Sequence, residues 1–217
     1  MSDISDSPTR VAVRAMRMLI TVLCAAFVAV TAAAAEEPPE ALVRKFTAEV
    51  LEAIQRDEAL QAGDRQKALA LAEEKILPHV NFREMTRLAS GRAWNSASAA
   101  QRDGLVSAFR AMLVRTYANA IDVYRGQTMQ VVPVRMPPGA TEVTVRNRYL
   151  SSGKPAIPVD YRMWQTAGGW KIYDIAVDGV SLVLTYRSEF EEEVRRTGVD
   201  GLIQKLGSKN SSALRPR

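Results

Sequence analysis

The sequence predicts one α+β domain, in which helices pack on one face of a four-stranded antiparallel meander sheet. Three observations support this prediction. Apolar residues recur with a helical period up to about residue 124, with a period of two from Gly126, and with a helical period again after Gly179. Only short stretches containing glycine or proline separate the strand segments, which favours hairpins over crossover connections.

The first 35 residues have the features of a secretory signal peptide. A start with three arginines is followed by the apolar run 18–30 and by small residues up to Ala35. The run is shorter than the roughly 20 apolar residues of a membrane span, although an uncleaved anchor is the alternative. We therefore expect residues 1–35 to be a cleaved signal peptide, and the mature protein to enter an export compartment. The only cysteine, Cys24, would leave with it, so the mature chain would have no disulfide.

Four stretches before the strand region have the spacing of amphipathic helices. They are residues 39–56, 64–78, 81–91 and 98–124. Pro78 and Gly91 are placed to end the second and third helices. Ser98 and Gln101 have the spacing of a capping box, which predicts the start of the fourth.

Four later segments alternate between apolar and polar residues, as strands do. They are residues 126–136, 140–151, 155–165 and 169–177. In the second segment, Val143, Val145 and Tyr149 alternate with Arg146 and Arg148. The third segment alternates in the same way. We therefore expect one apolar face covered by helices and one face in water.

The last strand and the helix after it are joined by very few residues. Gly179 allows a sharp exit from the strand, and Leu182, Tyr186 and Phe190 then recur every four positions. Gly198 is placed to end this helix, and a short last helix follows. We expect one domain over residues 36–206 and a disordered polar tail over 207–217.

The chemistry of the chain does not indicate catalysis. A net charge of +5 over 217 residues is mild and spread out, which does not favour nucleic acid. His79 is the only histidine, so we expect a structural or surface role for it, and neither a metal site nor a cofactor. The alternative enzyme is isomerase-like, with Asp160 and Tyr161 in a pocket. Neighbours on a strand face opposite ways, however, so only Tyr161 should line it.

Several segments together resemble the MlaC family of periplasmic phospholipid-binding proteins, also known as toluene-tolerance or ABC-transporter auxiliary proteins. The most specific is "VDGVSLVLTYRSEF" (177–190); "ILPHVNFREMTRLASGRAW" (76–94) and "GVDGLIQKL" (198–206) are similar as well. The resemblance implies a nuclear-transport-factor-like α+β fold whose helices and sheet enclose a pocket for acyl chains. It also implies that the protein is not an enzyme. The protein would lie in the periplasm and carry phospholipid between an outer-membrane lipoprotein complex and an inner-membrane ABC transporter complex, which has a lipid-binding substrate domain. The HpnM branch of the family implies hopanoid as an alternative lipid.

This interpretation predicts which side chains contact lipid. Only 6% of the residues are aromatic, so few bulky groups are available to fill the space between helices and sheet. The expected lining residues are Phe82, Met85, Leu113, Tyr117, Val143, Val145, Tyr149, Val159, Tyr161, Met163, Tyr173, Leu182, Tyr186 and Phe190. Arg187, next to Tyr186, should close or orient the joint after Gly179.

The opposite, polar face of the sheet is either a docking surface for partner proteins or simply a face in contact with water. Its candidate residues are Arg146, Arg148, Arg162 and Trp164. Besides the carrier and the enzyme, a third interpretation is a periplasmic interaction or chaperone module with a filled core. An open cavity would separate the carrier from that module.

Overall fold

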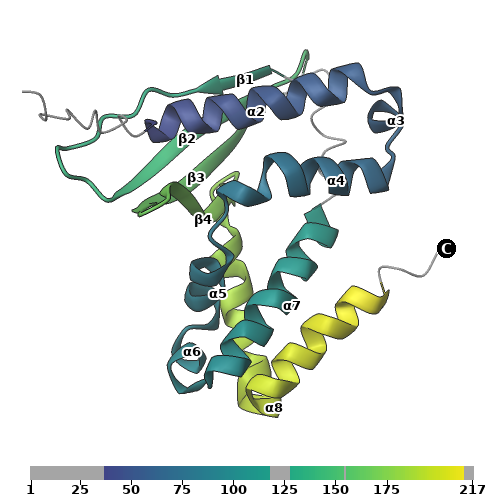
Figure 1. Ribbon diagram of the computed structural model, residues 1–217, viewed down its shortest axis with the longest axis vertical. Helices are drawn as coiled ribbons and strands as arrows, with labels where there is room; N and C mark the ends of the chain where they lie inside the picture. The colour runs from purple at the N-terminus through teal and green to yellow at the C-terminus, as the bar shows by residue number, and fades with distance from the viewer. Residues whose placement is uncertain (1–36, 118–127, 154, 213–217) are drawn as a thin grey trace, which may run out of the picture. The chain divides into compact units, whose positions relative to one another are not determined.

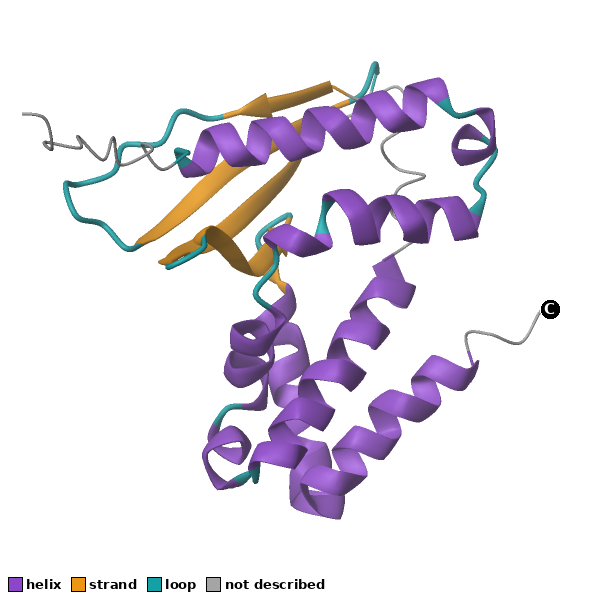
Figure 2. Cartoon of the chain, viewed as in Figure 1, coloured by secondary structure: helices purple, strands orange, loops and turns teal. Residues whose placement is uncertain are grey.

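The computed structural model describes residues 37–117, 128–153 and 155–212. The predicted signal peptide, the end of the predicted helix 98–124 and the last five residues of the predicted tail lie outside these ranges. The described residues belong to one compact unit, Glu37–Arg217. They form an α+β arrangement (Figures 1 and 2), which confirms the predicted fold class.

The predicted helices form, and their caps show why. Helices α2 (Pro39–Arg56), α4 (Arg65–Lys75), α5 (Phe82–Ser90) and α7 (Ala99–Tyr117) correspond to the four predicted stretches. The side-chain oxygens of Asp64 and Asn81 accept backbone N–H groups at the starts of α4 and α5. The capping box is present, since Ser98 and Gln101 bond each other's backbone N–H at 3.0 and 3.2 Å.

Three short elements were not predicted as separate pieces. They are α3 (Glu58–Gln61), the 3-10 turn Leu77–His79 and α6 (Arg92–Ser96). Pro78 lies within the 3-10 turn, so helix α4 ends three residues before it.

The sheet is an antiparallel meander in chain order, with five strands where we expected four. The strands are β1 (Thr128–Val131), β2 (Glu142–Leu150), β3 (Ile157–Thr166), β4 (Gly169–Val177) and β5 (Val180–Ser181). The extra strand β5 is two residues long and pairs with the end of β4. Asp178 and Gly179 both have positive φ, 50° and 80°, and this two-residue turn folds the chain back on itself.

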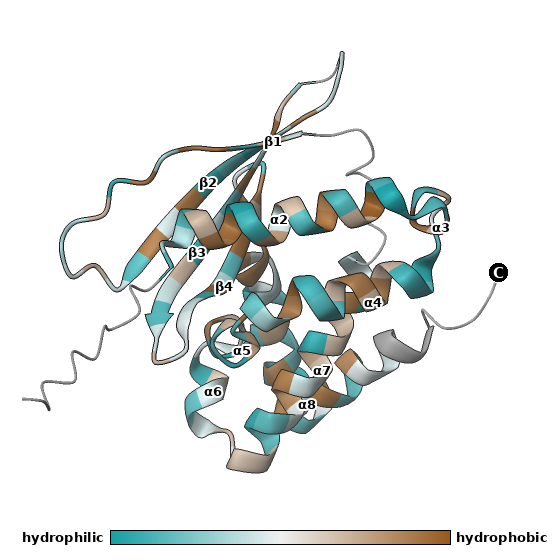
Figure 3. Ribbon diagram, turned by 45° about the horizontal axis from the view of Figure 1, so that its top comes forward, coloured by the Kyte–Doolittle hydropathy of each residue, from teal (hydrophilic) through white to brown (hydrophobic). Residues whose placement is uncertain are grey.

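The predicted alternation holds in β2 and β3. Val145, Tyr149 and Tyr161 are buried, whereas Arg146 and Arg148 are exposed. Figure 3 shows apolar and polar bands alternating along β2 and along α2. The apolar face therefore points toward helix α2, as expected for a sheet that has one face buried and the other in contact with water.

Helix α8 (Leu182–Ser212) begins directly after β5 and is broken once. Gly198 has φ 74° and ψ −177°, so the helix breaks at the predicted position. The second part continues to Ser212, past residue 206, where we expected the domain to end.

The buried apolar side chains form three separate clusters. One joins α5, α7 and α8, and includes Leu105, Phe109 and Phe190. The second joins the start of α2 to the sheet, and the third joins the end of α2 to α3 and α4. Each cluster packs within itself, and the space where they meet holds the site described next.

Candidate functional site

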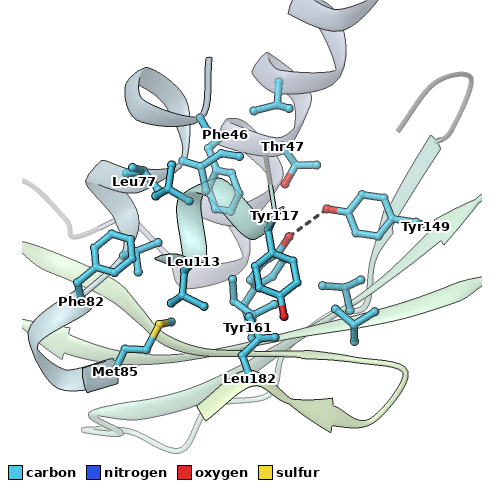
Figure 4. A pocket seen from close by; sticks show the side chains of 18 of the residues that line it. Phe46, Thr47, Leu77, Phe82, Met85, Leu113, Tyr117, Tyr149, Tyr161 and Leu182 are labelled. Carbon is cyan, nitrogen blue, oxygen red and sulfur yellow. Dashed lines mark hydrogen bonds between the residues drawn. The ribbon is translucent and has the colours of Figure 1, made fainter. Parts of the chain in front are cut away.

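A cavity of about 210 Å³ lies between helix α2, helices α4, α5 and α7, and the sheet. Figure 4 shows its walls from close by. Members of all three apolar clusters line it. The lining residues are Phe46, Thr47, Val50, Leu51, Ala72, Ile76, Leu77, Val80, Phe82, Met85, Leu113, Val114, Tyr117, Tyr149, Val159, Tyr161, Ile175, Val177 and Leu182.

The cavity wall is almost entirely hydrocarbon. Four of the described lining residues, Thr47, Tyr117, Tyr149 and Tyr161, carry a hydroxyl, and none carries a charge. Burying an ion without a partner costs far more free energy than burying a methylene group gains. The cavity therefore suits an apolar guest and excludes a charged one.

Eight of the fourteen predicted lining residues do line this cavity. They come from α5, α7, β2, β3 and the first turn of α8, and they are Phe82, Met85, Leu113, Tyr117, Tyr149, Val159, Tyr161 and Leu182. Figure 4 shows Phe82 and Met85 on one side and the tyrosines on the other. Leu182 joins them because the Asp178–Gly179 turn brings the start of α8 back against the sheet. Their contact with lipid is a prediction taken up below.

Three predicted residues on the correct face of the sheet lie away from the cavity. Val143, Val145 and Met163 belong to the cluster that the start of α2 makes with the sheet. Val145 and Met163 have no exposed surface, and Val43, packed in the same cluster, has none either. The physical reason is that α2 packs directly on this part of β2 and β3, so these side chains contact protein.

Tyr173 lies on the opposite face, because β4 contains an irregularity. Met163 pairs with Ile172, but Arg162 pairs with Asp174, so one extra residue of β4 lies between them. The Tyr173 ring packs against Trp164, and its hydroxyl donates to Glu142. Burial and this carboxylate raise the pKa of Tyr173 to about 12.

Tyr186 and Phe190 face another helix instead of the cavity. Their ring centroids lie 5.2 and 5.0 Å from that of Phe109 on α7. Helix α8 therefore uses its apolar stripe to pack against α7. Burial, together with a hydrogen bond to Tyr117, raises the pKa of Tyr186 well above its ordinary value of 10.

The wall supplied by α2 and α4 was missed by the sequence prediction. It includes Phe46, Val50 and Ala72. A signal was present, since Phe46 and Val50 belong to the apolar stripe that predicted helix 39–56. That stripe predicts a buried face, but it does not say whether the face meets protein or empty space.

Two of the described lining residues also reach the surface of the protein. Tyr117 and Val177 line the cavity and are 41% and 42% exposed. Val180 pairs with Val177 across the β4–β5 turn and is 61% exposed, and Leu184 is 57% exposed. An exposed apolar side chain, Val180, therefore lies next to an exposed lining residue, which is unusual for a surface in contact only with water.

The polar residues singled out in the sequence analysis contact neighbouring side chains of the protein. The His79 ring stacks on Phe46 with centroids 5.2 Å apart, and burial, then Lys171, lowers the pKa of His79 below 6.5. Arg187 lies outside the cavity and its Nε is 3.3 Å from Glu191 Oε1. Tyr161 lines the cavity, with its hydroxyl 3.0 Å from that of Tyr149, whereas Asp160 does not line it. The pair needed for isomerase-like chemistry is therefore not brought together there.

Comparison with known proteins places this arrangement in a family. The sequence model of the MlaC protein matches residues 44–208. The chain belongs to the MlaC family. One relative is the intermembrane phospholipid transport system binding protein MlaC from Haemophilus influenzae. It is 24% identical to this chain over 191 residues, which cover 87% of this chain and 89% of the relative. The toluene tolerance protein ttg2D of Pseudomonas putida is 25% identical over 187 residues, 85% of each chain.

A solved structure of a phospholipid-binding protein has the same fold. The phospholipid-binding protein of Ralstonia solanacearum, solved in complex with a phospholipid, is 34% identical to this chain with a TM-score of 0.75. The match covers 81% of this chain and 98% of that protein. The predicted resemblance to the MlaC family is therefore confirmed.

Two further features of this MlaC-family chain concern the described residues alone. Over residues 37–117, 128–153 and 155–212, no group of histidine, cysteine, aspartate or glutamate is arranged to hold a metal ion. Within the same ranges, every helix is too short or too polar to cross a bilayer.

Proposed function

We propose that this protein is a periplasmic phospholipid carrier that shields acyl chains in its cavity. The observation that carries the proposal is the apolar cavity without a charged side chain in its described lining. The names of its relatives and the phospholipid held by the Ralstonia protein support the same ligand class. In this proposal the protein catalyses no reaction.

The energetics of lipid extraction explain why such a wall is needed. A diacyl phospholipid has on the order of 30 methylenes, and at about 0.8 kcal/mol each they hold it in a bilayer with roughly 24 kcal/mol. Hydrogen bonds to a headgroup contribute only about 1 kcal/mol each. Burial of the chains must therefore supply most of the affinity, and the headgroup can stay in water at the mouth.

The size of the cavity indicates that it widens when lipid binds. An engineered cavity of about 150 Å³ holds one benzene ring, so 210 Å³ accommodates only part of one acyl chain. The buried side chains of the walls fall into three clusters, and Val80, which packs against two of them, is only partly buried. The walls can therefore move apart with little exposure of any cluster's interior. We infer that a diacyl lipid separates α2 and α4 from the helices around Phe109.

Exposed apolar side chains suggest how a lipid enters. Val180 pairs with the exposed lining residue Val177, and Leu184 follows the lining residue Leu182 by two positions in α8. An acyl chain leaving a membrane or a partner would meet apolar side chains before it reaches the cavity. We propose that the lipid comes from an outer-membrane lipoprotein complex and passes to an inner-membrane ABC transporter, or the reverse.

Filling the cavity tests the proposal. Ala72 lines the cavity from α4, and Ala72→Trp places a large ring in the space that lipid would occupy. We expect the protein to stay folded, within about 1–3 kcal/mol of its original stability, and to lose most of its co-purifying lipid. Ala70→Trp, the same change at an exposed position of α4, is the matched control.

Organic extraction followed by mass spectrometry gives both the amount and the identity of the lipid. Equal lipid content in the two variants would argue against the cavity as the binding site. Absence of lipid from the unchanged protein would remove the proposal. Hopanoid in place of phospholipid would keep the carrier function and change its cargo.

A further inference from the structure

Thr47 is a buried hydroxyl with an unusual environment. It is 4% exposed, lines the cavity from α2, and its Oγ1 atom has no hydrogen-bond partner among the described residues. A buried hydroxyl without a partner destabilises a protein, so such groups are rare and need a reason. Figure 4 shows the Thr47 side chain directed toward the cavity from α2.

Three other helical threonines show the arrangement that Thr47 avoids. Thr86, Thr185 and Thr197 each donate their hydroxyl to the carbonyl four residues earlier, at 2.6, 2.7 and 3.0 Å. This bond is the usual way for a threonine inside a helix to satisfy its hydroxyl. Thr47 lies inside α2 and could use the same bond to Val43. Its hydroxyl instead remains available for a group that enters the cavity.

The tyrosine pair on the sheet adds polar character to the same cavity. The hydroxyls of Tyr149 and Tyr161 lie 3.0 Å apart and both residues line the cavity. Figure 4 shows this pair joined by a dashed line. The cavity therefore has hydroxyl groups on two of its walls within otherwise apolar surroundings.

We propose that Thr47 donates a hydrogen bond to an ester carbonyl of the bound lipid, and so gives the cavity a preference for ester-linked glycerophospholipids. This inference rests on the proposed carrier function. The Thr47 hydroxyl needs an acceptor, and the ester carbonyls are the neutral acceptors at the top of the acyl chains. A phosphate could not take this place, because the described lining offers no positive charge to offset its burial.

A pair of lipids that differ only in this carbonyl tests the inference. The delipidated protein is incubated with vesicles of equal parts dioleoyl phosphatidylcholine and its diether analogue, and the bound lipid is measured by mass spectrometry. We expect about fivefold more ester lipid than ether lipid on the unchanged protein, the ratio that one net hydrogen bond gives. Thr47→Val, which keeps the shape and removes the hydroxyl, should bring the ratio close to one.

Matched variants separate the hydroxyl from other effects. Thr47→Ser keeps the hydroxyl and should keep the preference, as should Thr86→Val, since the Thr86 hydroxyl is bonded to its own helix. Thr47→Val should also raise the melting temperature of the delipidated protein, because it removes an unpaired buried hydroxyl. A purely structural threonine would lower it.

Three results would overturn the inference. Equal binding of both lipids by the unchanged protein, or an unchanged preference in Thr47→Val, would refute the role of Thr47 and leave the carrier function standing. Binding of neither lipid would refute the carrier function itself.

Discussion

Arg146 and Arg148 differ from the other two residues of the predicted docking surface. Both are exposed on the outer face of β2. Arg162 Nη1, in contrast, lies 3.7 Å from the buried Asp174, and the Trp164 ring packs 5.3 Å from the ring of Tyr173. Exposed charges at the edge of an interface mainly affect association with a partner, whereas residues held by neighbours affect the fold. We propose that Arg146 and Arg148 carry most of any docking.

Reversing these two charges tests the docking surface. Arg146→Glu combined with Arg148→Glu should weaken binding to the periplasmic domain of the transporter complex by about tenfold, mainly through slower association. Arg44→Glu combined with Arg195→Glu changes the net charge equally at two exposed positions outside the sheet. Surface plasmon resonance on both variants, with lipid content measured in parallel, separates docking from net charge. Equal binding by the two variants would contradict the assignment.

Single residues also show what the alternation of strands can and cannot predict. It placed Val145 and Val159 correctly on the apolar face, but only Val159 reaches the cavity. Which part of a face lies under a helix depends on where α2 crosses the strands, and this is not encoded in the period of either element. Thr47 was missed because a threonine in an apolar stripe resembles an ordinary neutral position.

At the scale of elements, the joint between β4 and α8 depends on one carboxylate. Asp174 is 1% exposed; its Oδ1 accepts the backbone N–H of Val183 and its Oδ2 accepts the hydroxyl of Ser181. A carboxylate at a helix N-terminus is favoured by the N–H groups and by the helix dipole. Asp174 therefore fixes the start of α8, and with it the position of Leu182 in the cavity wall.

The irregularity in β4 explains why this strand was the hardest to assign. Before it, the inward residues include Trp170 and Ile172; after it, they include Ile175 and Val177. An extra residue in the strand reverses which alternate positions face inward. The sequence of β4 therefore looks apolar on both faces, although inward and outward residues alternate regularly before the bulge and again after it. Its position follows from pairing with β3, which the sequence of β4 alone does not reveal.

A second carboxylate holds the two parts of α8 together across the break at Gly198. Glu193 is 4% exposed and accepts hydrogen bonds from Arg196, Thr197 and Lys205, at 2.7–2.9 Å. Lys205 lies beyond the break and the other two before it. The bond to Lys205, followed by those to Arg196 and Thr197, lowers the pKa of Glu193 from 4.5 to about 2.

This pKa predicts an acid-sensitive contribution to stability. The unfolded chain binds the proton near pH 4.5 and the folded chain only near pH 2, so protonation favours unfolding in this interval. The stabilisation is complete above pH 4.5 and is lost as the pH falls toward 2. Glu193→Gln should therefore lower the melting temperature by several degrees at pH 7, and the difference should vanish near pH 2.

Glu192→Gln, a neighbouring exposed position, is the control and should follow the unchanged protein throughout. Thermal unfolding followed by circular dichroism at a series of pH values gives the comparison. A constant difference between Glu193→Gln and the unchanged protein from pH 7 to pH 2 would show that the carboxylate charge is not the cause.

At the scale of the whole described domain, the cavity lies where three clusters of buried side chains meet. Val50, Phe46 and Leu113 belong to different clusters and all line it. Periodicity predicted the helices, the meander and the buried faces well, since each depends on local pattern. The volume between the faces depends on how far apart packed elements stay, so the sequence could suggest an empty interior through its few aromatics but could not locate its walls.

An empty cavity makes stability depend on its guest, and this gives a prediction for the domain as a whole. A ligand that binds only the folded state at about 100 times its Kd adds about 2.7 kcal/mol, which corresponds to about 5–10 °C in melting temperature for a domain of this size. Removing the lipid should lower the melting temperature of the unchanged protein by this amount. Ala72→Trp, whose cavity is filled by its own side chain, should show little change after the same treatment. Calorimetry before and after extraction, with mass spectrometry to verify lipid loss, provides the measurement. If extraction removes lipid from the unchanged protein without shifting its melting temperature, the lipid lies outside the domain interior, because a guest that buries its chains there must stabilise the fold that surrounds it.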